Sequence, residues 1–387
     1  MSKDNFVDYS IIRDDFLPVL KPCGDDDEVN ALAEVIKSGW WTKGKKVDEL
    51  EKRFAEMVGT KYAVALTSNT AGQDLIFKAL EIKNCDVISP TISFATTASV
   101  PLWNNCSSTL ADVDPINMNI SIDDVKMKIK DNTKAIIVVN HAGVPAPIKE
   151  IRTFFKGLII EDCAHSCYYD GAGLQGDIAV WSFQTVKTLP AGDGGMITLN
   201  DKNLYEKLNK MSWLGVSSTY SRSKSNNLNK KPGYSWDYNI DILGYKCYMN
   251  DLTASLALVQ LEKLPKYLEK RRYIQKRYNE ELINYLDIPP WSETVQYYCA
   301  KIKESENIKT ETVRNNLIEF LSQKNIHTSV HFKPLHLHSI FKQNSNFPVA
   351  EKEWIRLITL PCFPYMTDYD INYVIFWIKN FFDKFKN

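Results

Sequence analysis

The chain has 387 residues, of which 44% are hydrophobic and 24% are charged, and its 47 basic and 47 acidic side chains give a net charge of zero. This composition is typical of a globular protein with one large and one smaller domain. The balanced charge lacks the basic excess of a nucleic-acid-binding protein or of a protein held on an anionic membrane.

Targeting and redox signals are also lacking in the sequence. Residues 1–5 are not a basic segment followed by an apolar one, and no apolar run approaches the roughly 18 residues of a membrane span. Eight cysteines at irregular spacing do not form the pattern of a disulfide framework. We therefore expect a cytoplasmic protein with reduced thiols, and neither a nucleic acid nor a membrane as its partner.

Strand-like and helix-like segments alternate between about residue 60 and residue 200. Strands are predicted at residues 62–66, 87–89, 109–113, 134–140, 157–161, 178–183 and 196–199. Helices are predicted at residues 71–82, where apolar residues recur at helical spacing, and at 94–103. This alternation is typical of an α/β fold with a mainly parallel sheet covered by helices on both faces. In such sheets ligands bind beyond the carboxyl ends of the strands.

The segment after these elements has a different character. Residues 214–240 are polar and show no periodicity, which predicts a long loop with a functional or interface role. A long helix is predicted from residue 250 to residue 278, and Pro265 is expected to bend or interrupt it.

The C-terminal part of the chain is predicted to form a smaller α+β domain, with helices near residues 311–324 and 369–385. We therefore divide the chain into two domains. Residues 1–250 form the large domain with an N-terminal arm, and residues 251–387 form the small C-terminal domain, which includes the long connecting helix.

Two side chains suited to imine chemistry lie at strand ends. Lys187 comes between the strand at 178–183 and a glycine-rich turn at 191–195, and Asp162 follows the strand at 157–161. A lysine amine can form a Schiff base with an aldehyde cofactor, and a carboxylate can hold the proton of a pyridinium nitrogen. A solvated lysine and a helix-capping aspartate are the ordinary alternatives. The shared position of both residues at the carboxyl edge of the sheet favours the cofactor.

A candidate anion site occurs where residues 68–71 join the strand at 62–66 to the following helix. Free amides and hydroxyls at a helix N-terminus attract anions, although an ordinary Ser or Thr cap has the same sequence. Ser182, shortly before Lys187, can add a second hydroxyl to the same ligand. The two hydroxyl-bearing segments beside a lysine predict a phosphate site.

Cys163, His165 and Cys167 are potential zinc ligands in one short segment. Zinc sites usually combine a Cys-x2-Cys pair with a distant second pair, which the chain lacks. We therefore predict no metal site, and we expect His165 to pack on a ring or reach a phenolic oxygen. His331 and His336 can be substrate contacts or loop histidines without a special role.

These motifs together resemble a known family, the DegT/DnrJ/EryC1/StrS group of PLP-dependent nucleotide-sugar aminotransferases in the fold-type I (aspartate aminotransferase-like) superfamily. The resemblance extends from about Leu17 to Asp370. The matching segments are residues 38–47, 67–71, 90–96, 160–165, 182–187 with 192–195, 244–251 and 330–336. The chain departs from the family at Asn69, where glycine is usual, and at Lys246, where asparagine is common.

The resemblance implies a role for individual residues. Lys187 corresponds to the catalytic Schiff-base lysine, Asp162 to the partner of the pyridinium nitrogen, and Phe94 and His165 to the groups on the two faces of the cofactor, pyridoxal 5′-phosphate (PLP). The other implied cofactor-binding residues are Ser68, Asn69, Thr70, Ala71, Ser182, Gln184 and Lys246. The implied substrate-binding residues are Trp40, Lys43 and His331. Lys246 would reach the phosphate from a second subunit, which implies a homodimer with shared sites.

The resemblance also implies an activity, the PLP-dependent transfer of an amino group from L-glutamate to a keto-sugar nucleotide. The expected acceptor is a nucleotide-linked 4-keto-6-deoxyhexose, which gives a 4-amino-4,6-dideoxy sugar. One alternative is amination at C3 of a 3-keto-6-deoxyhexose nucleotide. Another is a PLP-dependent sugar dehydratase, in which histidine replaces the lysine, so that Lys187 argues against it. The sequence leaves the nucleotide, GDP, UDP or dTDP, open.

Two functions from other classes are alternatives to an aminotransferase. A non-catalytic sugar-nucleotide-binding protein on the same scaffold is disfavoured by the complete set of Lys187, Asp162 and Ser182. A Rossmann dehydrogenase is disfavoured because no Gly-x-Gly-x-x-Gly turn follows the first strands.

Overall fold

The computed structural model of the chain describes residues 8–167, 171–216, 239–304 and 308–385. Most of the loop predicted at residues 214–240 lies outside the described residues. The largest element is a seven-stranded sheet. Its strands are β1 (Tyr62–Leu66), β2 (Asp86–Pro90), β3 (Ser107–Ala111), β4 (Thr133–Val139), β5 (Leu158–Asp162), β6 (Ile178–Ser182) and β7 (Gly195–Leu199).

The strand order in this sheet is β1-β7-β6-β5-β4-β2-β3. All neighbours from β6 to β3 are parallel, whereas β7 is antiparallel to both β1 and β6. The predicted α/β fold with a mainly parallel sheet is therefore confirmed. Each predicted strand lies within two residues of the observed one, with the largest shift at β3.

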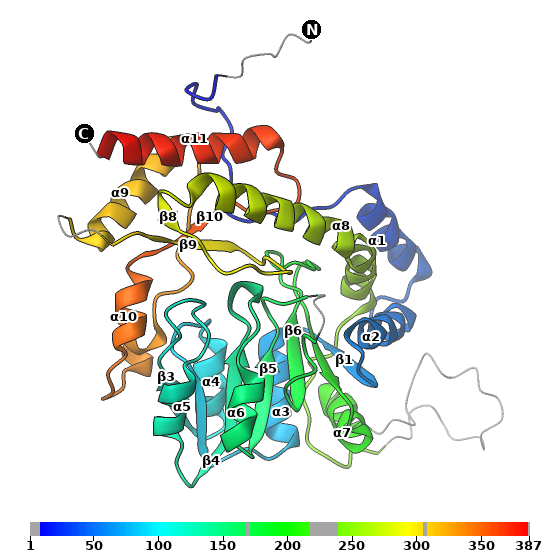
Figure 1. Ribbon diagram of the computed structural model, residues 1–387. Coiled ribbons are helices and arrows are strands. Elements are labelled where there is room, and N and C mark those ends of the chain that lie inside the picture. Colours follow the sequence, from blue (N-terminus) through cyan, green and yellow to red (C-terminus); the bar gives the residue numbers. More distant parts are fainter. Residues whose placement is uncertain (1–7, 168–170, 217–238, 305–307, 386–387) are drawn as a thin grey trace.

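Helices cover both faces of the sheet (Figure 1). Their bounds are α1 (Asp26–Ser38), α2 (Lys45–Val58), α3 (Asn69–Ala79), α4 (Thr96–Trp103), α5 (Ile122–Lys128), α6 (Ile148–Phe154), α7 (Lys202–Ser212) and α8 (Asp251–Leu282). Successive strand residues point to opposite faces. Ala179 and Trp181 of β6 pack in one cluster with α2 and α8, whereas Ile178 and Val180 pack with α3 and α7. The sheet is therefore buried on both sides, as its nearly continuous apolar strands predict.

Helix α8 connects the two parts of the molecule. Asn250 caps its N-terminus by accepting a hydrogen bond from Thr253 N at 2.9 Å. The helix continues for 32 residues through Pro265, so Pro265 does not interrupt it, and a bend at this residue stays a prediction. Leu264 and Leu268 on either side are fully buried against the large sheet, and this packing holds a turn that lacks one backbone hydrogen bond. Among the described residues, none of the helices combines the length and the apolar character needed to cross a membrane.

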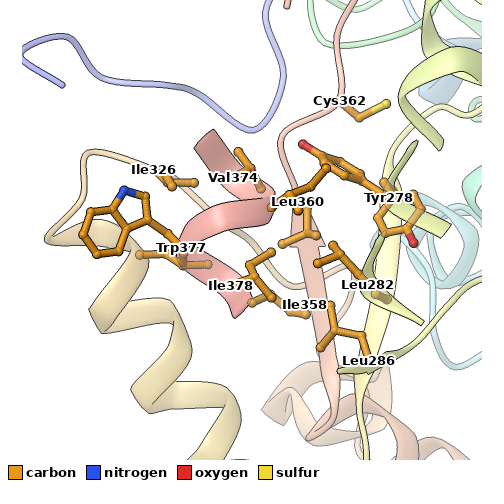
Figure 2. Packing of buried hydrophobic residues seen from close by; sticks show 14 of the residues in the cluster. Tyr278, Leu282, Leu286, Ile326, Ile358, Leu360, Cys362, Val374, Trp377 and Ile378 are labelled. Carbon is orange, nitrogen blue, oxygen red and sulfur yellow. The ribbon is translucent and has the colours of Figure 1, made fainter. Parts of the chain in front are cut away.

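A second core forms around a three-stranded antiparallel sheet with the order β10-β9-β8. The elements of this part are β8 (Leu286–Asp287), β9 (Tyr298–Ile302), β10 (Leu357–Leu360), α9 (Thr310–Ser322), α10 (Pro348–Trp354) and α11 (Asp368–Phe385). Figure 2 shows side chains of this core: Tyr278 and Leu282 of α8 lie beside Ile358 of β10, and Trp377 of α11 belongs to the same cluster on its other side. Helix α8 thus contributes to both cores, and the division at residue 250 stays a prediction.

Candidate active site

A cavity of about 550 Å³ lies where the carboxyl ends of the parallel strands meet the C-terminal part of the chain. It lies at the edge of the sheet at which ligands bind in folds of this class. Its lining residues are Ser68, Asn69, Thr70, Ser93, Phe94, Thr96, Val139, Asp162, Ala164, His165, Ser182, Gln184, Val186, Lys187, Asp193, Tyr297, His331 and Phe332. Most residues predicted for the site from the sequence are therefore together in this cavity.

Lys187 enters the cavity from the turn between β6 and β7. Two hydrogen bonds fix this turn, one from Lys187 N to Gln184 O at 2.8 Å and one from Gln296 Nε2 to Val186 O at 2.7 Å. Burial lowers the pKa of Lys187 from 10.5 to about 8, while the charge of nearby Asp162 acts in the opposite direction. A lysine with this pKa has an appreciable fraction of neutral amine close to neutral pH, which is the form that attacks an aldehyde.

Two consecutive glycines bring the Lys187 turn close to the start of α3. A Cβ atom at Gly195 would lie 2.3 Å from the carbonyl carbon of Ser68 and 2.5 Å from the nitrogen of Asn69. Gly194 has a φ of +154°, which side chains rarely adopt. The glycine-rich sequence after Lys187 is therefore required for the close approach of β7 to residues 68–69.

Asp162 ends β5 at the inner end of the cavity, with 5% of its surface exposed. Its Oδ1 accepts hydrogen bonds from Asn69 Nδ2 and Ala164 N, both at 3.0 Å, and its Oδ2 accepts one from Gln73 Nε2 at 2.8 Å. Burial raises the pKa of Asp162, and these donors together with the charge of Lys187 act against that rise. The carboxylate is thus held in one orientation and supported in its charged form.

Hydroxyl groups gather at another side of the cavity. Ser68 caps α3, because its Oγ accepts a hydrogen bond from Ala71 N at 3.0 Å. Thr70 Oγ1 lies 2.8 Å from Thr96 Oγ1, and Ser182 lines the same cavity. The free amides of the helix N-terminus and these hydroxyls suit an anion such as phosphate. The ordinary cap and the anion site, which the sequence presented as alternatives, are therefore compatible here.

Aromatic side chains form the walls. Phe94 is 66% exposed and lines the cavity, with its ring 6.5 Å from that of Phe332. The His165 ring stacks on Phe332 with 6.0 Å between ring centroids, and His165 Nδ1 lies 3.5 Å from Tyr297 Oη. His165 therefore makes both contacts that the sequence suggested for it. Flat groups of this kind suit a planar ring.

The histidines around the cavity are uncharged near neutral pH. Burial lowers the pKa of His141 to about 4, that of His331 to about 3, and that of His165 well below its usual value. His331 Nδ1 lies 2.9 Å from Thr359 Oγ1, which fixes the ring at the rim. Lys187 and Asp162 are therefore not surrounded by cationic imidazoles.

Four predicted residues do not line the cavity in the described part of this single chain: Ala71, Trp40, Lys43 and Lys246. Ala71 donates its amide to the Ser68 cap, Lys43 Nζ pairs with Glu51 at 3.2 Å, and Trp40 Nε1 donates to Lys43 O at 3.0 Å. Lys246 is exposed on the surface. The predicted contacts of these residues with cofactor or substrate stay predictions.

The sequence reasoning missed Gln73, Thr96, Tyr297 and Phe332. Gln73 is the most informative of these, because it is fully buried and lies one helical turn after Asn69. A polar residue at a buried position of an amphipathic helix was the available signal. Tyr297 and Phe332 come from distant segments, and only folding brings them to the cavity.

The potential metal ligands Cys163, His165 and Cys167 do not come together as a metal site in the described part of the chain. Within the described ranges, no group of three or more His, Cys, Asp or Glu side chains could hold a metal ion. Cys163 and Cys167 pack in the apolar core beside β6, and burial raises the pKa of Cys167 to about 12.

Comparison with known proteins places this site in a family. A model described as the DegT/DnrJ/EryC1/StrS aminotransferase family matches residues 22–379. An uncharacterized protein from Methanocaldococcus jannaschii is 35% identical over 386 residues, which cover 95% of this chain and 98% of that protein. The spore coat polysaccharide biosynthesis protein SpsC of Bacillus subtilis is 32% identical, with coverage of 94% of this chain and 96% of SpsC.

A solved structure supports the same assignment. Spr1654 from Streptococcus pneumoniae, assigned as a sugar aminotransferase and solved in a PLP form, is 27% identical with a TM-score of 0.85, and covers 95% of this chain and 99% of its own. The cavity fits this cofactor, because Lys187 offers an amine to its aldehyde, Asp162 a carboxylate to its ring nitrogen, and the start of α3 an anion site to its phosphate. PLP is accordingly the cofactor, and the chain belongs to the DegT/DnrJ/EryC1/StrS family of sugar aminotransferases.

Proposed function

We propose that this protein transfers an amino group from L-glutamate to a nucleotide-linked 4-keto-6-deoxyhexose and so produces a 4-amino-4,6-dideoxy sugar. The observation that carries the proposal is that Lys187, whose pKa burial lowers to about 8, lines one cavity with the buried carboxyl group of Asp162. The likeness to SpsC, a protein of spore coat polysaccharide biosynthesis, supports a sugar as the acceptor.

The roles of the chain's own residues follow from their positions. Bound PLP supplies an aldehyde for the amino group and an electron-withdrawing ring. Lys187 is placed to take the proton from Cα of the amino donor and to return a proton when the sugar ketone accepts nitrogen. Asp162 would hold the proton on the ring nitrogen, and Phe94 and His165 would lie on the two faces of the ring. One lysine therefore serves both halves of the transfer.

We further propose a homodimer in which Lys246 of one subunit reaches the phosphate of the other. Beside Lys246 the single chain exposes three apolar side chains, Ile240, Tyr245 and Leu243, the last with 91% of its surface accessible. An exposed apolar stretch of this kind is typical of a surface that a partner covers. His331 at the rim of the cavity, and Trp40 and Lys43 farther away, stay candidates for contacts with the substrate.

A panel assay tests the proposal. The purified protein, loaded with PLP, is incubated with ¹⁵N-labelled L-glutamate and with 4-keto and 3-keto 6-deoxyhexoses linked to GDP, UDP or dTDP. We expect label on C4 of one sugar nucleotide, as located by NMR. Label on C3 would establish the alternative regiochemistry, and loss of water without labelling would indicate a dehydratase. No change in any sugar would contradict the proposal.

A further inference from the structure

The buried carboxylate of Asp162 accepts hydrogen bonds from three groups. Asn69 Nδ2 and Ala164 N both bind Oδ1 at 3.0 Å, while Gln73 Nε2 binds Oδ2 at 2.8 Å. The Ala164 contact is a local turn of the backbone, made two residues after Asp162. The other two donors are side-chain amides that come from a separate element, α3.

Asn69 and Gln73 act as one unit. They stand one turn apart on α3, and Gln73 Nε2 also donates to Asn69 Oδ1 at 2.9 Å. Their exposed fractions are 7% and 0%, so both side chains are buried. Gln73 Oε1 has no hydrogen-bond partner among the described residues. Burying that oxygen is unfavourable, and the contacts made by Gln73 Nε2 are the evident compensation.

The three donors do not use every hydrogen-bond acceptor position of the carboxylate. An ionised carboxylate has about four acceptor positions, two on each oxygen. Oδ1 uses both of its positions for Asn69 and Ala164, and Oδ2 uses one for Gln73, so one position on Oδ2 is left by the donors of the described residues. Asp162 lines the cavity that contains Lys187, and a ligand in that cavity can use the remaining position.

We propose that Asn69 and Gln73 are positioning residues that fix the Asp162 carboxylate and leave a single acceptor position for the ring nitrogen of the cofactor. The inference deepens the proposed function and rests on it for the identity of the ring. Both amides donate to the charged form of the carboxylate, so they oppose the effect of burial, which favours protonation. A protonated Asp162 would lack the negative charge that stabilises a proton on the ring nitrogen.

The test compares Gln73→Met and Asn69→Ala with a matched control, Gln275→Met. Gln275 is equally buried, with 1% exposure, and its amide donates to Pro290 O at 3.2 Å outside the cavity. The first readout needs no activity: the titration of Asp162 in cofactor-free protein labelled with ¹³C at aspartate carboxyls, with its NMR signal assigned by its loss in Asp162→Asn. We expect the midpoint to rise by about one pH unit or more in both site variants and to stay unchanged in the control.

The second readout is the half-reaction with L-glutamate, followed by the loss of visible absorbance of the PLP-loaded protein. We expect its rate constant to fall roughly tenfold in Gln73→Met and Asn69→Ala. The acid limb of the pH profile should move to higher pH, and the KM for glutamate should stay nearly constant. The control keeps the wild-type profile even where its thermal stability is lower.

The inference is overturned if both site variants titrate Asp162 at the wild-type pH and keep the wild-type pH profile, since the amides would then only attach α3 to β5. Failure of the proposed function looks different. In that case the wild-type protein aminates no sugar of the panel, while the titration of Asp162 still responds to Asn69 and Gln73.

Discussion

The Lys187 amine is half protonated at about pH 8, because burial lowers its pKa to about 8. Below that pH the neutral fraction falls roughly tenfold for each pH unit. We therefore expect the rate at which cofactor-free protein binds PLP through Lys187 to rise up to about pH 8 and to level off above it, as followed by stopped-flow absorbance. A rate that still rises tenfold between about pH 9 and pH 10 would indicate a lysine with an ordinary pKa.

Asp162→Asn preserves the shape of the side chain but removes the charge that stabilises a protonated ring. We expect a loss of about 3 kcal/mol of transition-state stabilisation, or roughly a hundredfold in kcat, measured with saturating PLP. Asp162 also raises the pKa of Lys187, so the pH profile of cofactor binding should move to lower pH in this variant.

Asp201→Asn is the matched control for this substitution, because asparagine replaces the Asp201 cap of α7 with little change in helix stability. Its kcat should equal that of the wild type. Steady-state rates of Asp162→Asn close to those of the control would remove Asp162 from the mechanism.

At the scale of residues, the reactive side chains were easier to predict from the sequence than the side chains that hold them in place. Lys187, Asp162 and Ser68 were predictable because they follow apolar strands whose carboxyl ends share one edge of a sheet. Asn69 lines the cavity, and its cofactor contact stays a prediction, but the hydrogen bond from its side chain to Asp162 was not predicted. Gln73 was not predicted at all, because its partner is far away in sequence and only the packing of α3 on the sheet brings the two together.

At the scale of elements, the site depends on how closely β7 passes the start of α3. A side chain at Gly195 would collide with the backbone of Ser68 and Asn69, which cannot move without displacing the cap of α3. We expect Gly195→Ala to destabilise the protein by about 2 kcal/mol, measured by denaturant unfolding, and to weaken PLP binding.

Gly24→Ala is the control for that prediction, because a Cβ atom at Gly24 lies 3.6 Å from its nearest neighbour in ordinary contact. It should leave both stability and PLP affinity close to the wild type. Equal behaviour of the two alanine variants would show that the approach of β7 to α3 is not required for the site.

The pattern of elements was largely predictable, whereas their spatial order was not. Apolar runs located each strand of the large sheet, yet nothing in the run of β7 indicated that it inserts antiparallel between β1 and β6. Local propensity predicts a bend or an interruption at Pro265, whereas the packing of α8 on the large sheet keeps the helix continuous there. Tertiary contacts routinely override such local preferences.

At the scale of the whole molecule, the single chain brings Lys187, Asp162, Phe94 and His165 into one cavity but leaves Lys246 on the surface. If the Lys246 ammonium group binds the cofactor phosphate in the partner subunit's site, then each site uses Lys187 of one subunit and Lys246 of the other. Lys187→Ala and Lys246→Ala then remove different groups of a shared site. Mixed subunits should then form heterodimers with one intact site, and an equal mixture should regain roughly a quarter of wild-type activity by random assortment. Verified heterodimers without activity, or a fully active monomer, would contradict the shared site.

The most direct measurement on the central claim is the location of the covalent bond between the cofactor and the protein. The PLP-loaded protein is reduced with borohydride, digested and analysed by mass spectrometry, with Lys187→Ala as the control. The account predicts a phosphopyridoxyl group on the peptide that contains Lys187 and none on any peptide of the control, which should keep its fold. A modification on another lysine, or an unmodified Lys187 peptide from protein with full PLP occupancy, would contradict the account.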